Sequence, residues 1–460
     1  MRHFVYRTLE ELAEAAAGAG VTHVRFATSA DQVRRVLARS VRVGAFTVAN
    51  SIAIQPMEGC DGTLDGSPGE LTWRRYRRFA QGGAALIWFE ATAVREDGRA
   101  NPRQLWITRQ NVAEFARLRA ELEQAFVPIQ LTHSGRYSVP RRTIAYHNPH
   151  IDRLTGTPPD YPVISDDELE RLEDDYVRAA GLALDAGFQA VDIKAVHGYL
   201  ISELLGAKTR DGRYGGTLEN RVRFIRNVIG KLRAAFGSRL MIAMRMNAFD
   251  GVPFRRDPAT GVGIPCDFET PYPYGWGVDA GNPLYEDLGE VKQAIAWFRE
   301  WGVELLNISL GSPYYNPHIG RPFEKPDEGN YEQPEHPVLG VDRHFRIAAE
   351  LQRAFPGLPM VGTGYSWLQK YALNAAAHNI AAGNVRFFGV GRGALAYPDF
   401  AHDALEKGEL DERRCCKTLT YCTYLMRQKN HPLGQFPTGC PPFDKEGYGE
   451  VIKLARHARR

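Results

Sequence analysis

Short apolar runs alternate with amphipathic stretches along most of the chain. The runs are rich in Val, Ile, Leu and Phe, and the stretches between them repeat their apolar positions with a helical period. The runs predict eight strands, at residues 51–56, 85–90, 128–132, 190–194, 240–246, 304–309, 359–362 and 385–390. Helices are predicted at residues 70–81, 109–124, 166–186, 219–236, 288–301, 342–355, 365–379 and 399–407.

Eight strand–helix repeats are what a closed (β/α)8 barrel requires. Parallel strands need helical crossovers, and closure leaves no strand edge exposed. An open doubly wound sheet is the alternative. The first strand–helix junction, QPMEG at residues 55–59, lacks the glycine spacing of a dinucleotide-binding turn. The pattern therefore favours an α/β fold of the TIM-barrel type.

The barrel is predicted to span residues 41–408. Residues 1–40, with two short helices, form an N-terminal extension, and residues 409–460 form a C-terminal tail that contains cysteines.

Three long segments rich in Pro, Gly and aromatic residues each follow a strand, at residues 134–161, 247–282 and 311–337. In a barrel all three fall on the rim where active sites are built. Their aromatic side chains, Tyr137 and Tyr314 among them, would line a pocket for a flat organic ligand or form small clusters beneath the loops.

Composition narrows the class of protein. The 460 residues carry 57 Lys+Arg against 54 Asp+Glu, a net charge of +3, which disfavours a disordered or nucleic-acid-coating chain. The first residues lack a signal-peptide core, and no run approaches the ~18 apolar residues of a membrane span. We therefore expect a cytoplasmic protein without membrane or nucleic-acid partners.

The fourth predicted strand, residues 190–194, offers chemistry at its end. Asp192 and Lys194 share the strand face opposite the two β-branched residues, so Lys194 should point inward, with His197 and Tyr199 just beyond. These groups can donate hydrogen bonds to an oxygen that gains negative charge and supply a proton nearby. The alternative is an Asp192–Lys194 ion pair beside a packed Tyr199.

Glycine-containing turns at residues 362–364 and 389–393 follow strands seven and eight, where barrels commonly bind a phosphate. Arg392 in the second turn would suit a dianion. Arg245, near the end of strand five, is a second candidate for a cation that faces the barrel interior. The alternative is that it forms a salt bridge. Gln130 is polar within an apolar run, and a buried amide needs a partner such as a cofactor edge or a water.

Four segments carry a resemblance to a known family: AVDIKAVHGYL at 190–200, RYGGTLENR at 213–221, IQLTHSGR at 129–136 and GVGRGALAYPDF at 389–400. Over residues 41–405 the sequence resembles the Old Yellow Enzyme family, the FMN-dependent NAD(P)H:flavin oxidoreductases and ene-reductases. The resemblance implies that hydride passes from NAD(P)H through flavin N5 to an activated alkene such as an α,β-unsaturated carbonyl.

The same resemblance implies roles for individual residues. Tyr199 matches the proton donor, and His197 and Lys194 match the pair that binds the substrate oxygen. Arg245 would lie near the N1/O2 edge of the flavin. Residues matching those beside the ring are Pro56, Met57, Glu58, Ala91 and Gln130, and those matching the phosphate site are Thr363, Gly364, Gly391 and Arg392. A planar small-molecule substrate and a homo-oligomer are further expectations.

Two residues depart from the family pattern. Lys194 stands where the family usually has His, which would favour anionic ligands. Glu58 stands where Thr or Cys is common near the flavin N5/O4 edge, and its charge would lower the reduction potential of the flavin.

The cysteines of the tail also depart from the pattern of longer relatives, which bind an iron–sulfur cluster through C-x2-C-x3-C and a later Cys. Here the register is Cys415, Thr418, Cys422 and Cys440, so the second thiolate is missing, and the adjacent Cys416 points elsewhere. We expect neither a cluster nor another metal site, and interpret the tail as a thiol-lined remnant.

Alternatives remain at this point. A dehydrogenase or amine-oxidising flavoenzyme could share the fold, a barrel lyase could use Lys194 as a Schiff-base nucleophile, and a binding protein could retain FMN without turnover.

Overall fold

The structure, a computed structural model, describes residues 3–458. Within that range one parallel sheet of nine strands has the order β4-β3-β13-β12-β11-β8-β7-β6-β5. Its strands are β3 (Ile52–Ile54), β4 (Leu86–Ile87), β5 (Phe89–Ala93), β6 (Pro128–Thr132), β7 (Ala190–Ile193), β8 (Met241–Phe249), β11 (Val303–Leu310), β12 (Met360–Gly362) and β13 (Phe387–Val390).

The second predicted strand closes this sheet into a barrel. It is split into β4 and β5, which lie at the two ends of the strand order and are separated only by Trp88. β4 pairs with β3 and β5 pairs with β6, while Trp88 N donates to Ile54 O at 2.9 Å. The predicted (β/α)8 barrel is therefore confirmed, with each predicted strand in place.

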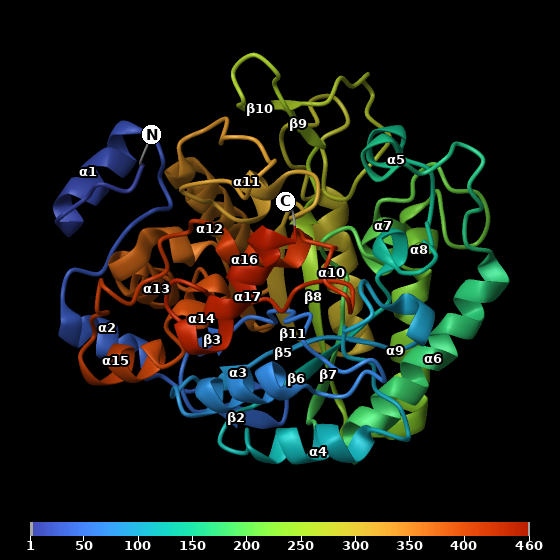
Figure 1. Ribbon diagram of the computed structural model, residues 1–460, viewed down its shortest axis with the longest axis horizontal. Coiled ribbons are helices and arrows are strands. Elements are labelled where there is room, and N and C mark those ends of the chain that lie inside the picture. The colour runs from blue at the N-terminus through green and yellow to red at the C-terminus, as the bar shows by residue number, and fades with distance from the viewer. Residues whose placement is uncertain (1–2, 459–460) are drawn as a thin grey trace.

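Helices surround the barrel (Figure 1). The outer helices are α3 (Glu70–Ala80), α4 (Val112–Ala120), α6 (Asp166–Asp185), α9 (Arg223–Phe236), α10 (Gly289–Trp301), α12 (Pro337–Ala354), α13 (Ala372–Ala381) and α15 (Phe400–Glu406). The helix predicted over residues 365–379 differs: its first part, Tyr365–Tyr371, is a 3-10 segment, because Gln369 takes a left-handed φ of 50° that interrupts the α-helix.

Strand alternation separates two apolar layers. Val191 and Ile193 pack against the helices, whereas Ala190 packs inside the barrel. The interior cluster also includes Val43 and Val48 of the hairpin formed by β1 (Val41–Val43) and β2 (Phe46–Val48), which covers the amino ends of the strands. The opposite end, where the strands finish, is left for polar side chains.

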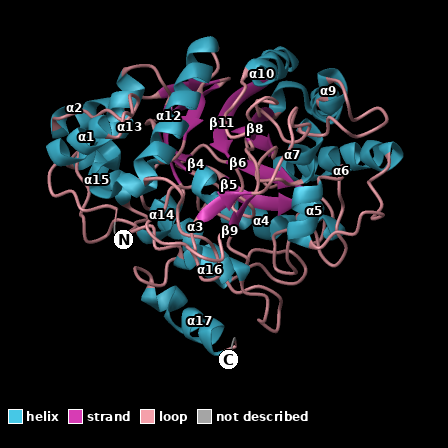
Figure 2. Cartoon of the chain, turned by 90° about the horizontal axis from the view of Figure 1, so that it is seen from above, coloured by secondary structure: helices cyan, strands magenta, loops and turns pink. Residues whose placement is uncertain are grey.

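Segments outside the repeats pack onto the barrel. Helix α2 (Ala30–Leu37), preceded by α1 (Leu9–Gly18), contacts α13 and α15. The C-terminal segment, with α16 (Tyr421–Arg427) and α17 (Lys445–His457), lies in front of the barrel in Figure 1 and on one side of it in Figure 2. The rim also carries α5 (Pro149–Thr155), α7 (Leu200–Leu205), α8 (Leu218–Arg221), β9 (Phe254–Arg256), β10 (Gly263–Pro265), α11 (Pro317–Gly320) and α14 (Arg392–Ala396).

In residues 3–458 no helix combines the length and the apolar character that crossing a membrane requires.

Candidate active site

One pocket at the carboxyl ends of the strands collects the residues that the sequence predicted for catalysis and cofactor binding. It encloses about 1170 Å³, open solvent at its mouth included. The predicted residues that line it are Pro56, Met57, Glu58, Ala91, Gln130, Lys194, His197, Tyr199, Arg245, Thr363, Gly364, Gly391 and Arg392.

A layer of buried hydrogen bonds forms the floor of this pocket. Asp192 accepts from Trp88 Nε1 at 2.7 Å, from Gln130 Nε2 at 2.6 Å and from the backbone N of Arg245 at 2.6 Å. The Gln130 amide nitrogen therefore has a carboxylate partner, and Gln130 also lines the pocket. Within the described range Asp192 and Lys194 do not form the ion pair considered above, so Lys194 stays available to a ligand.

Hydrogen-bond donors without partners face the pocket above that floor. Gln55 accepts from Asn307 Nδ2 at 2.6 Å, which leaves Gln55 Nε2 buried and unpaired among the described residues. Arg245 Nε is likewise unpaired, and burial lowers the pKa of Arg245 to about 10. Because a buried donor without a partner costs about 1–3 kcal/mol, a ligand edge rich in acceptors would be stabilised here.

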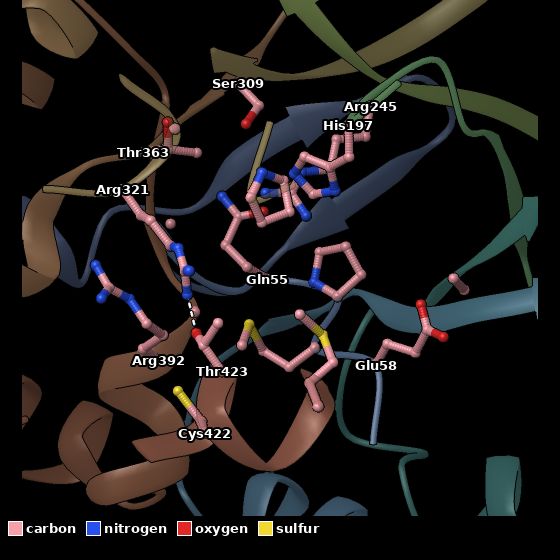
Figure 3. A pocket seen from close by; sticks show the side chains of 18 of the residues that line it. Gln55, Glu58, His197, Arg245, Ser309, Arg321, Thr363, Arg392, Cys422 and Thr423 are labelled. Atoms are coloured by element: carbon pink, nitrogen blue, oxygen red, sulfur yellow. Dashed lines mark hydrogen bonds between the residues drawn. The ribbon is translucent and has the colours of Figure 1, made fainter. Parts of the chain in front are cut away.

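Two guanidinium groups meet at the far end of the pocket, opposite Glu58 (Figure 3). Arg392 donates to Pro322 O at 2.8 Å, and its Nη1 has no hydrogen-bond partner within residues 3–458. Arg321 donates to Thr423 Oγ1. Its Nε and Nη2 have no hydrogen-bond partner in that range, although Nη2 lies 4.0 Å from the Asp327 carboxylate. Burial and the charge of Arg392 lower the pKa of Arg321. Asp327 also pairs with Arg427, so it offsets only part of this positive charge, and an anion bound between Arg321 and Arg392 would be stabilised.

The glycine turns bring backbone close to the same end. Gly364 has a φ of 93°, and a Cβ there would lie 2.9 Å from His344 Cβ. A Cβ on Gly391 would lie 2.9 Å from Met57 Sδ. The Thr363 hydroxyl is already engaged with His344 Nδ1 at 2.9 Å, so this turn can offer its backbone but not its side chain to a ligand.

Lys194, His197 and Tyr199 converge on the side of the pocket near Glu58. Lys194 Nζ lies 3.7 Å from the centroid of the Tyr199 ring, a cation–π contact. The Tyr199 hydroxyl donates to Glu58 Oε2 at 3.3 Å and shares a 3.1 Å hydrogen bond with the hydroxyl of Tyr314. His197 has a left-handed φ of 66°, which turns the chain sharply at the end of β7.

Burial sets the protonation states of these groups. Lys194 is 4% exposed, and desolvation lowers its pKa to about 8 against the opposing pull of Glu58. Desolvation, with the charges of Arg245 and Lys194, lowers the pKa of His197 well below its usual value, so the imidazole is neutral. Desolvation and Glu58 raise the pKa of Tyr199, which keeps its proton at neutral pH. The site therefore holds a charged donor, a neutral donor and a phenol.

Arg321 and the wall contributed by α16 were not predicted. Cys422, Thr423 and Met426 of α16 line the pocket beside Arg321. A lone Arg in a long loop and a short amphipathic stretch carry no distinctive sequence signal.

All six cysteines are free thiols. Cys416 and Cys422 are close enough to raise the pKa of the half-buried Cys440 by their charge, although burial is the larger cause. Across residues 3–458 no three His, Cys, Asp or Glu side chains gather in a way that could hold a metal ion.

Comparison with known proteins defines the class of enzyme. The model of the NADH:flavin oxidoreductase / NADH oxidase family matches residues 37–259. The chain is 28% identical to the NADPH dehydrogenase of Bacillus subtilis (strain 168), covering 60% of this chain and 74% of the relative. It is 30% identical to the NADPH dehydrogenase of Listeria monocytogenes serotype 4a (strain HCC23), over 58% of this chain and 70% of the relative. The fold is similar to that of the old yellow enzyme homologue from Zymomonas mobilis, with a TM-score of 0.58 and 22% sequence identity. The match covers 82% of this chain and 94% of the homologue.

The barrel and its pocket are thus those of a flavin-dependent oxidoreductase. The chain belongs to the Old Yellow Enzyme family of NADH:flavin oxidoreductases. FMN is the cofactor of this family and NAD(P)H its co-substrate. The pocket fits FMN: unpaired nitrogens of Arg321 and Arg392 suit the phosphate at one end, and those of Gln55 and Arg245 suit a ring edge with carbonyl acceptors.

Proposed function

We propose that this enzyme uses NAD(P)H to reduce the carbon–carbon double bond of an α,β-unsaturated carbonyl compound. The observation that carries the proposal is the convergence of Lys194, His197 and Tyr199 in the pocket that ends at Arg321 and Arg392. When bound, FMN would supply the two-electron chemistry between the nicotinamide and an electron-poor carbon.

The side chains of the chain supply binding and a proton. Lys194 and His197 hold the carbonyl oxygen, and their hydrogen bonds strengthen as negative charge develops on it. The Tyr199 hydroxyl then gives its proton to the α-carbon. Glu58 and Tyr314 fix the direction of that hydroxyl through their hydrogen bonds to it.

The visible spectrum of the purified holoenzyme tests the proposal. Anaerobic NADH or NADPH should bleach the flavin bands, and 2-cyclohexenone should restore them with formation of cyclohexanone. Bleaching without recovery, tried with enones, enals and nitroalkenes, would rule out the alkene reductase activity while leaving the family assignment intact.

Binding of a carboxylate ligand should weaken as the pH rises through about 8. Lys194 has a pKa lowered to about 8, so its ammonium is present below that pH and lost above it. Benzoate keeps one charge over pH 6–10, so the change reports on the protein. Flavin difference spectra measure the dissociation constant at each pH, and Lys194→Met should give weak binding that no longer varies around pH 8. An unchanged pH profile in that variant contradicts the assignment.

Glu58→Thr should raise the reduction potential of the bound flavin. A carboxylate beside the site disfavours added negative charge, and a shift of roughly 30 mV corresponds to about 1.4 kcal/mol for a two-electron couple. An anaerobic titration with a reference dye measures the potential, and Glu58→Gln separates charge from shape. A potential that falls or stays constant in both variants argues that Glu58 acts on Tyr199 alone.

Amine oxidation is the second candidate. The rings of Tyr137 and Tyr314 are stacked, with their centroids 3.9 Å apart. Together with the nearby Glu58 carboxylate they could attract a substrate ammonium. The Lys194 ammonium above Tyr199 repels such a cation, which favours the reductase. Steady-state turnover of primary and tertiary amines with an artificial electron acceptor distinguishes the two.

A further inference from the structure

A second cavity adjoins the active-site pocket. It encloses about 1580 Å³, open solvent included, and Glu58, Tyr314 and Met426 line both spaces. Tyr314 and Glu58 are also the residues that hydrogen-bond to Tyr199. A molecule reaching Tyr199 could therefore extend past these shared residues into the second cavity.

Part of the wall of this cavity is apolar. Tyr137, Pro140, Ile151 and Tyr315 line it, and Leu154 of α5, 47% exposed, lies on the same wall. An exposed leucine beside rings and aliphatic carbons suits an acyl or aryl chain.

The charges that face the cavity are unbalanced. Four arginines and one lysine line it, Arg136, Arg141, Arg142, Arg427 and Lys429, while the one acidic lining residue is Glu58 at the shared wall. Two of the cations form ion pairs with carboxylates that do not line the cavity. Arg136 pairs with Asp152 and Glu203, and Arg427 pairs with Asp327.

The other three cations are not paired with a carboxylate within residues 3–458. Arg142 donates to the backbone O of Gly156 at 3.1 Å, a neutral acceptor. Arg141 and Lys429 form no ion pair or side-chain hydrogen bond with any residue in the described part of the chain, although both line the cavity. The outer part of the cavity is therefore positive, while its inner end is aromatic.

We propose that the second cavity binds the anionic tail of an elongated substrate whose double bond is reduced in the first pocket. This inference rests on the proposed function and specifies its substrate: an α,β-unsaturated carbonyl compound with a hydrocarbon spacer and a terminal carboxylate or phosphate. The spacer lies along Ile151 and Leu154, and the anion is held by Arg141, Arg142 and Lys429.

Matched substrates test this inference on the holoenzyme. Three substrates share the same enone and the same medium-length alkyl chain and differ only at the end of that chain. The terminal group is a carboxylate, its methyl ester or a phosphate monoester. The charged forms should have a KM about 3- to 10-fold lower than the ester at low salt, with similar kcat, because a few solvent-facing charges contribute modestly. The carboxylate and phosphate arms show which anion the cavity prefers.

Arg141→Gln/Lys429→Gln should abolish that preference through KM while the turnover of 2-cyclohexenone stays unchanged. Arg413→Gln/Lys453→Gln is the matched control, because both residues lie on the exposed surface and line neither cavity. Equal KM values for acid and ester in the wild type, or a preference that survives in the first variant, would overturn the inference.

A binding measurement separates this inference from the proposed function. Calorimetry with the saturated carboxylate, which cannot be reduced, should give a dissociation constant that rises in Arg141→Gln/Lys429→Gln and not in the control. If 2-cyclohexenone is not reduced but this binding difference is present, the alkene reductase proposal fails and the anion site stands. If 2-cyclohexenone is reduced and the binding difference is absent, the anion site fails alone.

Discussion

Tyr199→Phe should slow the reduction of an enone by about 10²- to 10⁴-fold, the usual contribution of a positioned general acid. The phenol is held by Glu58 and Tyr314, so its proton is aimed in one direction, and phenylalanine retains the ring without that proton. Reduction of the flavin by NAD(P)H needs no proton from Tyr199, so this half-reaction should keep its rate.

Rapid-mixing absorbance at the flavin band measures the two half-reactions separately. Tyr137→Phe is the matched control: it removes a hydroxyl from the same aromatic group, and Tyr137 stacks on Tyr314 without contacting Glu58. Equal slowing of both half-reactions in Tyr199→Phe, or an equally slow enone step in Tyr137→Phe, would contradict the assigned role.

Arg321→Gln/Arg392→Gln should weaken the binding of FMN by about 100-fold or more. Each guanidinium keeps at least one buried, unpaired nitrogen facing the pocket. Hydrogen bonds to charged groups contribute about 1.5–3 kcal/mol each, and 1.4 kcal/mol is a factor of ten in affinity.

Titration of the apoprotein with FMN, followed by quenching of flavin fluorescence, gives the dissociation constant. Riboflavin provides the control within the same protein, because it has the ring but no phosphate, and its affinity should change little in the variant. Parallel losses for FMN and riboflavin would place the phosphate elsewhere and assign the two arginines a structural role.

The barrel could be predicted because each of its repeats is encoded locally. Alternation along residues 190–194 was enough to direct Asp192 and Lys194 inward. The helix predicted over residues 166–186 begins at a capping box, in which Ser165 Oγ accepts from Glu168 N at 3.2 Å. The hydrogen bond between Gln130 and Asp192 depends on strand register: the two residues are direct partners across β6 and β7, which periodicity alone does not specify.

The contribution of Arg321 to the proposed phosphate site could not be predicted for a related reason. Arg321 and Thr423 are brought together by the packing of α16 on the rim, and neither residue lies in a segment with a distinctive pattern. The predicted tail of residues 409–460 was interpreted from its cysteines alone. In the structure this segment contributes Cys422, Thr423, Met426 and Thr438 to the pocket wall.

Because α16 forms part of that wall, we expect the rate of flavin exchange to depend on how often this helix detaches. Arg321 donates a hydrogen bond to Thr423 of this helix, at the end of the pocket where we expect the phosphate, and the helix follows the barrel in the chain. Long residence of the flavin would then be a kinetic property of one short helix, separable from equilibrium affinity, and limited proteolysis before Tyr421 should release the yellow colour from an otherwise folded barrel.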